Sequence, residues 1–580
     1  MDILFIDTFQ KLDSYQYSLG INILSTIVNT KSDYTSEVIS FSNLLLDKKM
    51  PTSILFEKNY ETIVNYILNK NPKIISFYTL ENSYFISLIV AKNIKEKNSD
   101  IKIILAGPQA SLCSSETLKT FDFIDFIAIG EGEKNIISII DYFNNKEEVK
   151  NIKGVCYRES DKIFYTEPSP LVENLNELPI LQLNENALPT KLNIETGRGC
   201  PYNCTFCSTK TFWKRKVRLK SIDRLINEIQ YYMTRYNINH FRFTHDLFTV
   251  SKKHILGFCN RVINSGIKIE WTCSARADNL DEEMVSLMKK AGCKKIFFGI
   301  ETGSQLMQEE INKNLNMSKV KDTIKLVDRY GIEMKISFIY GFPEEKEKDL
   351  LQTLDLIRFC VEDMLIPKVL LSKCMCFPGT YIYNTNKSNL IFNNDNFILF
   401  NYPAKSQLHF IKEHPNLFSS LFMINNELLN KYFYLDICIN YIYGFLFNTT
   451  PKTLKEIITY YNNNILDFYV EYSTAIKEVV TLLTKKIYFD DNLSFSKIIF
   501  DSVEDFSKNK IQDEFIMQLL KFEISMLRIS QQNKNNKEPK VLTFDYDMLT
   551  YYEHLIKKKE KCKLAFDVTE YGEIKISKVM

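Results

Sequence analysis

The sequence predicts an α/β fold in three parts: a doubly wound parallel sheet, a partial (β/α) barrel and a mainly helical C-terminal region. Short apolar runs rich in β-formers alternate with helical stretches from residue 1 to about 150, and this alternation resumes from 191 to about 385. Beyond residue 386 the strand-like runs give way to aromatic-rich stretches with helical spacing. We therefore expect domains over 1–150, 191–385 and 386–580, with a hairpin and linker at 151–190.

The first domain is predicted to be a flavodoxin- or Rossmann-like parallel sheet covered by helices on both faces. Strands are expected over 3–7, 37–41, 73–78, 102–106 and 123–129, and helices over 17–29, 59–70 and 83–97. Ligands of such sheets bind beyond the carboxyl ends of the strands, where glycines let the backbone come close. Two loops occupy such positions, and their candidate binding residues are Gly107, Pro108, Gln109, Gly130, Glu131 and Gly132.

The second domain is predicted from a first strand at 191–197 followed by five helix–strand units. The later strands are expected over 240–244, 269–275, 295–301, 335–341 and 367–377. Repeats of this length imply parallel strands with right-handed crossovers, so functional residues belong at the carboxyl ends of the strands. The residues of interest at those ends are Asp246, Arg276, Glu301, Ser304 and Gly341. Arg276 and Glu301 can bind a ligand through charge-assisted hydrogen bonds or simply pair with each other.

The C-terminal region is expected to contain amphipathic helices and a final group of strands with a helix. The helices are expected over 425–447, 453–472, 473–486 and 513–530. Their many Tyr and Phe side chains can line a substrate cleft or fill a helical core, and the core is the default interpretation. This region carries no motif of its own, and we expect it to encode the choice of substrate.

The composition gives no electrostatic basis for binding nucleic acid or a membrane. The chain has 73 Lys and Arg against 71 Asp and Glu, for a net charge of +2. Its apolar runs are shorter than a membrane span, and its first residues lack the basic and apolar regions of a signal peptide. We therefore expect a cytoplasmic protein, a compartment in which thiols stay reduced.

Three cysteines in the run GRGCPYNCTFCS are the most informative residues of the chain. Cys200, Cys204 and Cys207 lie close together in sequence, as the thiolate ligands of an iron–sulfur cluster do. A four-iron cubane with three protein ligands leaves one iron open to a small molecule that offers an amine and a carboxylate. S-adenosylmethionine (SAM) is such a molecule, and one electron from the cluster would break its sulfonium bond and yield a 5′-deoxyadenosyl radical.

Two other interpretations of the cysteines are weaker. A structural zinc site needs four ligands, and no nearby Cys or His supplies a second pair. A disulfide framework belongs to small exported proteins rather than to a chain of 580 residues. The remaining cysteines are too scattered for a second cluster, and the CxC pair of Cys374 and Cys376 suits core packing.

The pattern CxxxCxxC, with an aromatic residue at Phe206, resembles the signature of the radical SAM superfamily. In that family the aromatic side chain lies beside the adenine of SAM. The resemblance extends to the strand ends, where Asp246, Arg276, Glu301, Ser304 and Gly341 match positions that contact SAM. It implies a [4Fe-4S] cluster on the three cysteines, SAM as a cofactor, and a reducing partner such as flavodoxin or ferredoxin.

The segment from PKIISFY through KIILAGPQAS to FIAIGEGE resembles the cobalamin-binding domain of cobalamin-dependent radical SAM enzymes. The resemblance implies that the loops at Gly107–Gln109 and Gly130–Gly132 hold the corrin and its nucleotide tail. The DxHxxG motif, whose histidine binds cobalt in other B12 proteins, is absent, since the first histidine is His240. Many members of the family bind the corrin without it, while some relatives keep the domain and bind none.

The resemblance implies a radical SAM methyltransferase that acts on an unactivated carbon of a peptide or small-molecule biosynthetic intermediate. Other members of the architecture catalyse cyclisation or rearrangement without methyl transfer. A methylthiotransferase would need three cluster cysteines in the N-terminal domain, where only Cys113 and Cys156 occur. A non-enzymatic scaffold is the last alternative, and loss of activity in Cys200→Ala would argue against it.

Overall fold

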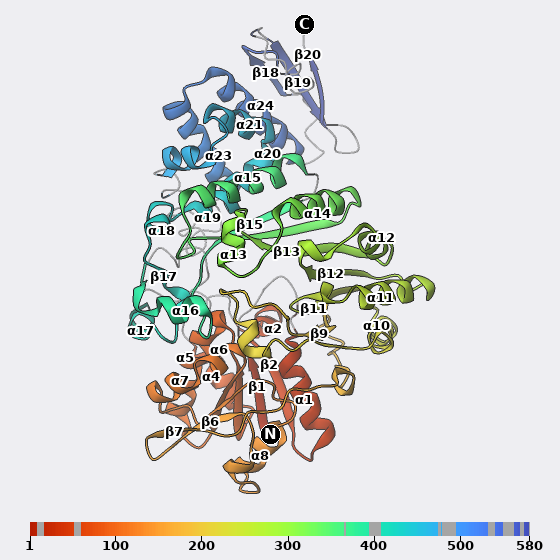
Figure 1. Cartoon of the computed structure of the whole chain (residues 1–580), viewed down its shortest axis with the longest axis vertical. Helices are drawn as coiled ribbons and strands as arrows, with labels where there is room; N and C mark the ends of the chain where they lie inside the picture. The colour runs from red at the N-terminus through yellow and green to blue at the C-terminus, as the bar shows by residue number, and fades with distance from the viewer. Residues whose placement is uncertain are drawn as a thin grey trace.

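The computed structural model describes the three expected parts stacked along one axis, with the N-terminal sheet at one end and the barrel in the middle (Figure 1). The C-terminal helices and a small sheet form the other end. The described residues are 1–8, 15, 17–50, 60–364, 367–393, 408–473, 477, 495–531, 540–548, 559, 562–568 and 574–578. Among them, no helix combines the length and apolarity that crossing a bilayer requires.

The N-terminal sheet has seven strands in the order β2-β1-β3-β4-β5-β6-β7, and the first five are parallel. Alternate residues of each strand face opposite sides, which explains why two separate apolar clusters cover the sheet. The parallel strands are β1 (Ile3–Asp7), β2 (Ser36–Ser40), β3 (Ile74–Tyr78), β4 (Lys102–Ala106) and β5 (Phe126–Ala128). The helices are α1 (Leu19–Lys31), α2 (Phe41–Leu46), α4 (Glu61–Leu68), α5 (Glu81–Lys97), α6 (Pro108–Leu112), α7 (Ser114–Thr120) and α8 (Ile136–Phe143).

The predicted hairpin of the connector belongs to this sheet. Its strands, β6 (Val155–Glu159) and β7 (Lys162–Tyr165), add antiparallel to the edge of β5. Val155 and Cys156 at the start of β6 are fully buried in the apolar layers of the sheet. The sheet therefore extends to residue 165, beyond the boundary at 150, because the edge of β5 needs a partner for its backbone groups.

The barrel is a parallel sheet of six strands in the order β15-β14-β13-β12-β11-β8. Its strands are β8 (Leu192–Glu195), β11 (His240–Thr244), β12 (Glu270–Ala275), β13 (Cys293–Glu301), β14 (Glu333–Tyr340) and β15 (Pro367–Lys373). The helices between them are α10 (Ile222–Tyr236), α11 (Lys252–Asn264), α12 (Glu282–Lys290), α13 (Gln305–Glu310), α14 (Met317–Arg329) and α15 (Glu347–Asp363). The expected strands and crossover helices are all present, and the sheet is open rather than closed.

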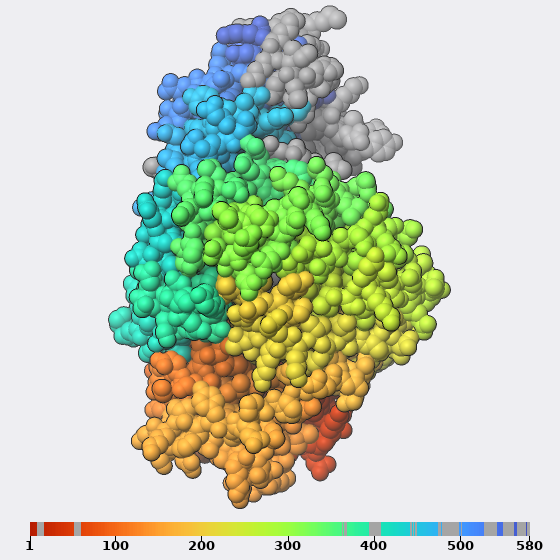
Figure 2. Space-filling model, in the orientation of Figure 1, coloured from red at the N-terminus to blue at the C-terminus, as the bar shows by residue number. Residues whose placement is uncertain are grey.

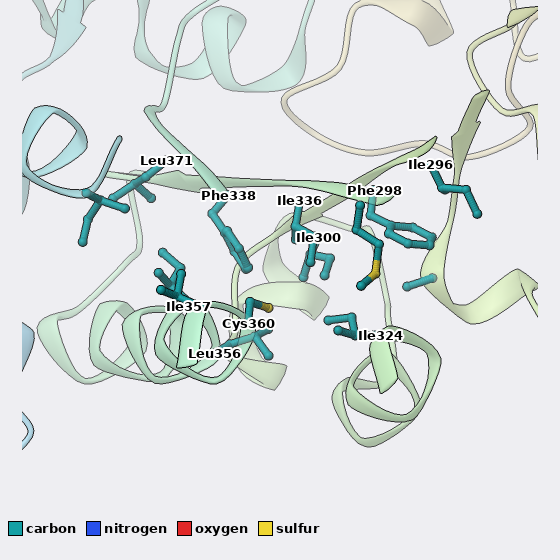
Figure 3. Packing of buried hydrophobic residues seen from close by; sticks show 14 of the residues in the cluster. Ile296, Phe298, Ile300, Ile324, Ile336, Phe338, Leu356, Ile357, Cys360 and Leu371 are labelled. Atoms are coloured by element: carbon teal, nitrogen blue, oxygen red, sulfur yellow. The ribbon is translucent and has the colours of Figure 1, made fainter. Parts of the chain in front are cut away.

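The outer face of the barrel packs on its helices. Figure 3 shows Phe338 and Leu371 pointing toward Ile357 of α15. Side chains alternate along each strand, so the residues on either side of these two face the interior of the half barrel. The interior face is more open, and Phe297 is 37% exposed there. This arrangement leaves the carboxyl ends of the strands free to form a site.

The C-terminal region does more than stack on the barrel. Residues 408–422, which we call the strap, contain α17 (Leu408–Glu413) and pack against the N-terminal domain, as Figure 1 shows. Phe418 of the strap contacts Tyr84 and Phe85 on α5, with ring centroids 5.7 and 6.0 Å apart respectively. The region predicted as one helical domain thus also contributes to the N-terminal core.

The segment after the strap covers the edge strand β15. Leu371 of β15 donates its backbone N–H to Asn440 Oδ1 at 2.7 Å, and Asn440 Nδ2 donates to the Leu371 carbonyl at 2.7 Å. A partly buried ion pair between Lys373 and Asp436, 2.9 Å long, lies beside this contact. The side chain of Asn440 therefore takes the place of a neighbouring strand.

The remaining C-terminal elements agree with the predicted mixture of helices and terminal strands. The helices are α16 (Tyr381–Asn386), α18 (Glu427–Lys431), α19 (Leu435–Ile437), the π-helix η9 (Cys438–Tyr443), α20 (Gly444–Thr449), α21 (Pro451–Tyr460), α23 (Phe495–Phe506) and α24 (Glu514–Gln531). The strands β18 (Lys540–Phe544), β19 (Cys562–Val568) and β20 (Ile574–Lys578) form an antiparallel sheet. The helix expected over 473–486 and the one expected with the final group of strands fall largely outside the described residues.

Candidate functional site

The three cysteines lie on the loop 199–217, which we call the cluster loop. A short antiparallel ribbon closes it, because β9 (Gly197–Arg198) pairs with β10 (Arg218–Leu219). Figure 2 shows the region around residue 200 in yellow, between the orange N-terminal domain and the green strands of the barrel. Gly199 begins the loop at a φ of +89°, and a Cβ there would lie 2.0 Å from the Lys216 carbonyl oxygen. Only glycine can therefore occupy this position without moving the loop.

Two residues that follow β11 bind the backbone N–H and the backbone carbonyl of Gly199. Asp246 Oδ2 accepts a hydrogen bond from the Gly199 N–H at 2.9 Å, and His245 Nε2 lies 3.0 Å from the Gly199 carbonyl. Burial lowers the pKa of His245 to about 4, so the ring is neutral and donates from Nε2. Asp246, which we predicted to contact SAM, therefore binds the backbone of the cluster loop in this structure.

The thiols of the cluster loop are only partly enclosed. Cys200, Cys204 and Cys207 are all half-buried and free. Burial raises the pKa of Cys204 to about 11 and also raises that of Cys200. Among the described residues, no three Cys, His, Asp or Glu side chains converge on a single ion. In a four-iron cluster each cysteine would bind a different iron.

Arg276, at the end of β12, supports the cluster loop from the barrel side. Its guanidinium binds both carboxylate oxygens of Asp278 at 2.9 and 2.8 Å and lies 3.9 Å from the ring centroid of Tyr202. Burial opposes the charge, but Asp278 outweighs burial and raises the pKa of Arg276. The side chain therefore stays charged beside the cysteines.

Glu301, at the end of β13, faces the same place from the next strand. A register shift between Gly299 and Glu301 and a φ of +71° at Glu301 turn its carboxylate inward. The carboxylate forms a buried ion pair with Lys313, 2.6 Å long. Lys313 Nζ lies 5.7 Å from the ring centroid of Phe206 in the cluster loop. Arg276 and Glu301 therefore pair with Asp278 and Lys313 respectively, rather than with each other.

Ser304 and Gly341 have structural partners. Ser304 Oγ donates to Asp349 at 2.7 Å and caps α13 by accepting from the Met307 N–H, and the residue is fully buried. The Gly341 N–H donates to the Glu345 carboxylate, and Leu429 fills the space a Cβ would need. These two residues shape the barrel mouth from behind.

A cavity of about 540 Å³ separates the carboxyl edge of the N-terminal sheet from the cluster-loop side of the barrel. Apolar residues of α1, β4 and α8 form part of its lining, namely Leu24, Ile104, Ile136 and Ile139. The barrel side contributes Glu195, Arg198 and Asp246, and the cluster loop contributes Ser208, Thr209, Phe212 and Trp213. The cavity is therefore lined by both apolar and polar side chains.

Five of the six loop residues predicted to bind a cofactor line this cavity: Gly107, Pro108, Gly130, Glu131 and Gly132. Gln109 is the exception. It lies in the first turn of α6, where its side chain faces the strap and donates to the Leu417 carbonyl at 2.9 Å. Gly107 begins that turn at a φ of +98°, and a Cβ there would lie 2.7 Å from the Thr79 carbonyl oxygen.

Several residues lining the cavity have unsatisfied acceptors. Asn135 Oδ1, Glu195 Oε2 and His245 Nδ1 are buried without a hydrogen-bond partner among the described residues. Such groups are costly unless a ligand or water satisfies them. They fit a ligand that combines a large apolar body with N–H donors, and a corrin with its side-chain amides is such a ligand.

Sequence reasoning missed Lys313, His245 and Arg198. Lys313 lies in a loop beyond α13, and its pairing with Glu301 depends on the bulge in β13. His245 resembled a packing residue, although its place directly after a barrel strand was a usable signal. Arg198 precedes the first cysteine by two residues, and a charged residue beside a metal-binding loop is the signal that could have found it.

The comparisons with known proteins agree with this geometry. Residues 194–357 match the radical SAM superfamily. The chain is 29% identical over 316 residues to an uncharacterized methyltransferase of Pyrococcus horikoshii, an alignment that covers 53% of this chain and 69% of that protein. It is 27% identical over 284 residues to the anaerobic magnesium-protoporphyrin IX monomethyl ester cyclase of Rubrivivax gelatinosus, covering 47% of this chain and 51% of the cyclase.

Among solved structures, the fold is similar to that of OxsB, a cobalamin-dependent S-adenosylmethionine radical enzyme solved with aqua-cobalamin and S-adenosylmethionine bound. The TM-score is 0.59 at 16% identity, and the match covers 92% of this chain and 82% of OxsB. The radical SAM methyltransferase TsrM of Kitasatospora setae gives a TM-score of 0.56 at 14% identity, over 68% of this chain and 79% of TsrM. At these identities the likeness is one of fold.

Proposed function

From the premise that this chain is a radical SAM enzyme with relatives of the cobalamin-binding type, we propose that it is a cobalamin-dependent methyltransferase. Its substrate would be a peptide or a small-molecule biosynthetic intermediate with an unactivated carbon. The observation that carries the proposal is the cavity between the N-terminal sheet and the cluster loop, because both halves of the reaction need one shared enclosed space.

The residues of this chain divide the binding of the cofactors between them. Cys200, Cys204 and Cys207 would hold a [4Fe-4S] cluster, and Phe206 with the barrel ends would receive SAM. The apolar part of the cavity lining, with Ile104, Ile136 and Ile139, would contact the nucleotide tail of a corrin. When bound, the cluster supplies the electron that generates a radical from SAM, and the corrin supplies methyl transfer.

The protein residues keep this chemistry in place. His245 and Asp246 hold the start of the cluster loop through Gly199, and Arg276 holds Tyr202. The Lys313 ammonium lies beside Phe206, and the Glu301 carboxylate rather than water binds it. Buried pairs of this kind resist rearrangement, so the loop does not have to be ordered by the cofactors themselves.

The test is anaerobic purification with hydroxocobalamin present, followed by reconstitution with iron and sulfide. We expect about one corrin for each four-iron cluster. After the bound corrin has been reduced to cob(I)alamin with titanium(III) citrate, SAM labelled in its methyl group should leave label on the corrin before any substrate is added. A protein with a cluster and no corrin contradicts the proposal.

A second candidate function is a radical cyclisation without methyl transfer. It is favoured by the similarity to the magnesium-protoporphyrin IX monomethyl ester cyclases, which cover about half of this chain. In that case the corrin would bind without acquiring label from methyl-labelled SAM, while 5′-deoxyadenosine would still form. A methylthiotransferase is disfavoured, because Cys113 and Cys156 are buried in the apolar core of the N-terminal sheet.

A further inference from the structure

The loop that forms one wall of the cavity also touches the cluster loop. Glu131 lies between Gly130 and Gly132, beyond the end of β5, and all three residues line the cavity. The Glu131 side chain is only 3% exposed, yet it reaches out of its own domain. One short loop is thus part of both halves of the proposed site.

The ribbon that closes the cluster loop carries two arginines directly opposite each other. Arg198 on β9 is the register partner of Arg218 on β10, and both guanidiniums lie over the ring of Trp213, at 5.8 and 5.4 Å from its centroid. Like charges opposite each other on neighbouring strands repel. The ribbon therefore needs an anion between its two arginines.

Glu131 is that anion. Its Oε1 accepts from Arg198 Nη1 at 2.8 Å and from Arg218 Nη1 at 2.7 Å. Its Oε2 accepts from Arg218 at 3.0 Å and from the Val172 N–H of the connector. Glu133 and Glu195 bind the rest of Arg198, at 2.6 and 2.7 Å. One carboxylate of the N-terminal domain therefore joins both ends of the cluster loop.

We propose that Glu131, Arg198 and Arg218 form a latch that sets the distance between the cluster loop and the occupant of the cavity. The inference rests on the proposed function, since it takes that occupant to be a corrin. Glu131 is a positioning residue in this scheme. It acts through the two arginines, and displacement of its loop by a ligand is transmitted directly to residues 199–217.

The test compares the wild-type chain with Glu131→Gln, which keeps the shape of the side chain and removes its charge. Both proteins are reconstituted anaerobically, loaded with hydroxocobalamin and reduced with dithionite. Electron paramagnetic resonance then reports the magnetic interaction between reduced cluster and cob(II)alamin, which falls steeply with distance. We expect an unchanged iron content and, for each bound corrin, a weaker or heterogeneous interaction in Glu131→Gln. An interaction identical to that of the wild type overturns the latch.

Glu173→Gln is the matched control. Glu173 contacts the same cluster loop through an exposed pair with Lys216, 3.5 Å long, and lies outside the cavity. Surface pairs of this kind contribute little, so this variant should keep the wild-type interaction. An equal change in both variants would show that any carboxylate near the loop has the same effect, and would also overturn the latch.

Amide hydrogen exchange makes the test independent of corrin. Peptides spanning 199–217 are expected to exchange about tenfold faster in Glu131→Gln than in the wild type or Glu173→Gln. If the wild type binds no corrin, the proposed function fails while this measurement still decides the latch, and equal exchange rates reject it. If Glu131→Gln does not fold, Arg218→Lys replaces it with the same expected change, because lysine lacks the planar fork of arginine.

Discussion

The two walls of the cavity differ in the side chains that line them. The N-terminal wall combines aliphatic side chains and glycine-containing turns, as at Ile104, Ile139 and Gly107, with the Glu131 carboxylate, which reaches across to the other wall. The barrel wall carries charged side chains that are already bound to other parts of the protein, as Arg198 and Asp246 are. The difference indicates that the first wall recognises a ligand by shape, whereas the second holds the reactive loop in place.

The largest effects should separate the two walls completely. Ala128 lies at the end of β5 and lines the cavity, so Ala128→Phe fills the space that the ligand needs. We expect corrin content to fall by about tenfold or more with iron content unchanged. Cys204→Ala should do the reverse, abolishing the cluster and SAM cleavage while corrin still binds. Parallel loss of both cofactors in either variant would mean that the walls are not independent.

The next effect concerns the buried pair behind Phe206. Lys313→Met leaves the Glu301 carboxylate buried without its partner, at a cost of about 3–5 kcal/mol in the free energy of unfolding. The double variant Glu301→Met/Lys313→Met should recover most of that loss, since no charge is left unpaired. We expect neither variant to recover SAM cleavage, measured as 5′-deoxyadenosine. Full activity in the double variant would show that the pair contributes only to packing.

Glu345, behind the barrel mouth, should make the stability of the protein depend on pH. Burial raises its pKa from 4.5 to about 8, although the Gly341 and Phe342 N–H groups act in the opposite direction. The folded state thus holds this proton more tightly than the unfolded chain does. Stability must therefore fall as the pH rises from about 4.5 toward 8.

Glu345→Gln removes this titration. Relative to the wild type, the variant should gain on the order of 1–3 kcal/mol in the free energy of unfolding between pH 5 and pH 8. Denaturant unfolding of both proteins at the two pH values measures the difference. A constant difference across that range would show that the carboxyl is ionised throughout.

The smallest effect should come from Gln109, which sequence analysis grouped with the ligand-binding loops. Its side chain donates to the Leu417 carbonyl of the strap, so Gln109→Leu loses one buried hydrogen bond, about 1–2 kcal/mol. Corrin content should not change. A clear loss of corrin in this variant would show that the strap shapes the cavity from a distance.

The sequence was sufficient for the parts of the molecule that repeat. Strands and helices of both sheets follow from apolar periodicity, and strand ends are where parallel sheets place their functional residues, as at Asp246 and Arg276. The same logic located the loop at Gly130. The cysteine spacing alone predicts a cluster on Cys200, Cys204 and Cys207, and the structure places these residues on one loop.

Contacts between distant segments could not be predicted in this way. The pairing of Glu131 with Arg198 joins residues 67 positions apart, and periodicity carries no information on such partners. The inward turn of Glu301 depends on a local register shift. No element was predicted for the strap, and the sequence around Phe418 does not indicate whether that side chain packs on the barrel or on the N-terminal domain.

Asn440 has a consequence for the synthesis of the chain. The residue that completes β15 follows Leu371 by 69 positions, so at ordinary rates of translation the ribosome supplies it roughly 3–14 s later. During that interval the backbone of β15 is available to strands of other nascent chains. A chain cut short before residue 440 would keep that liability for its lifetime, even with the three cysteines of the cluster loop and both walls of the cavity in place.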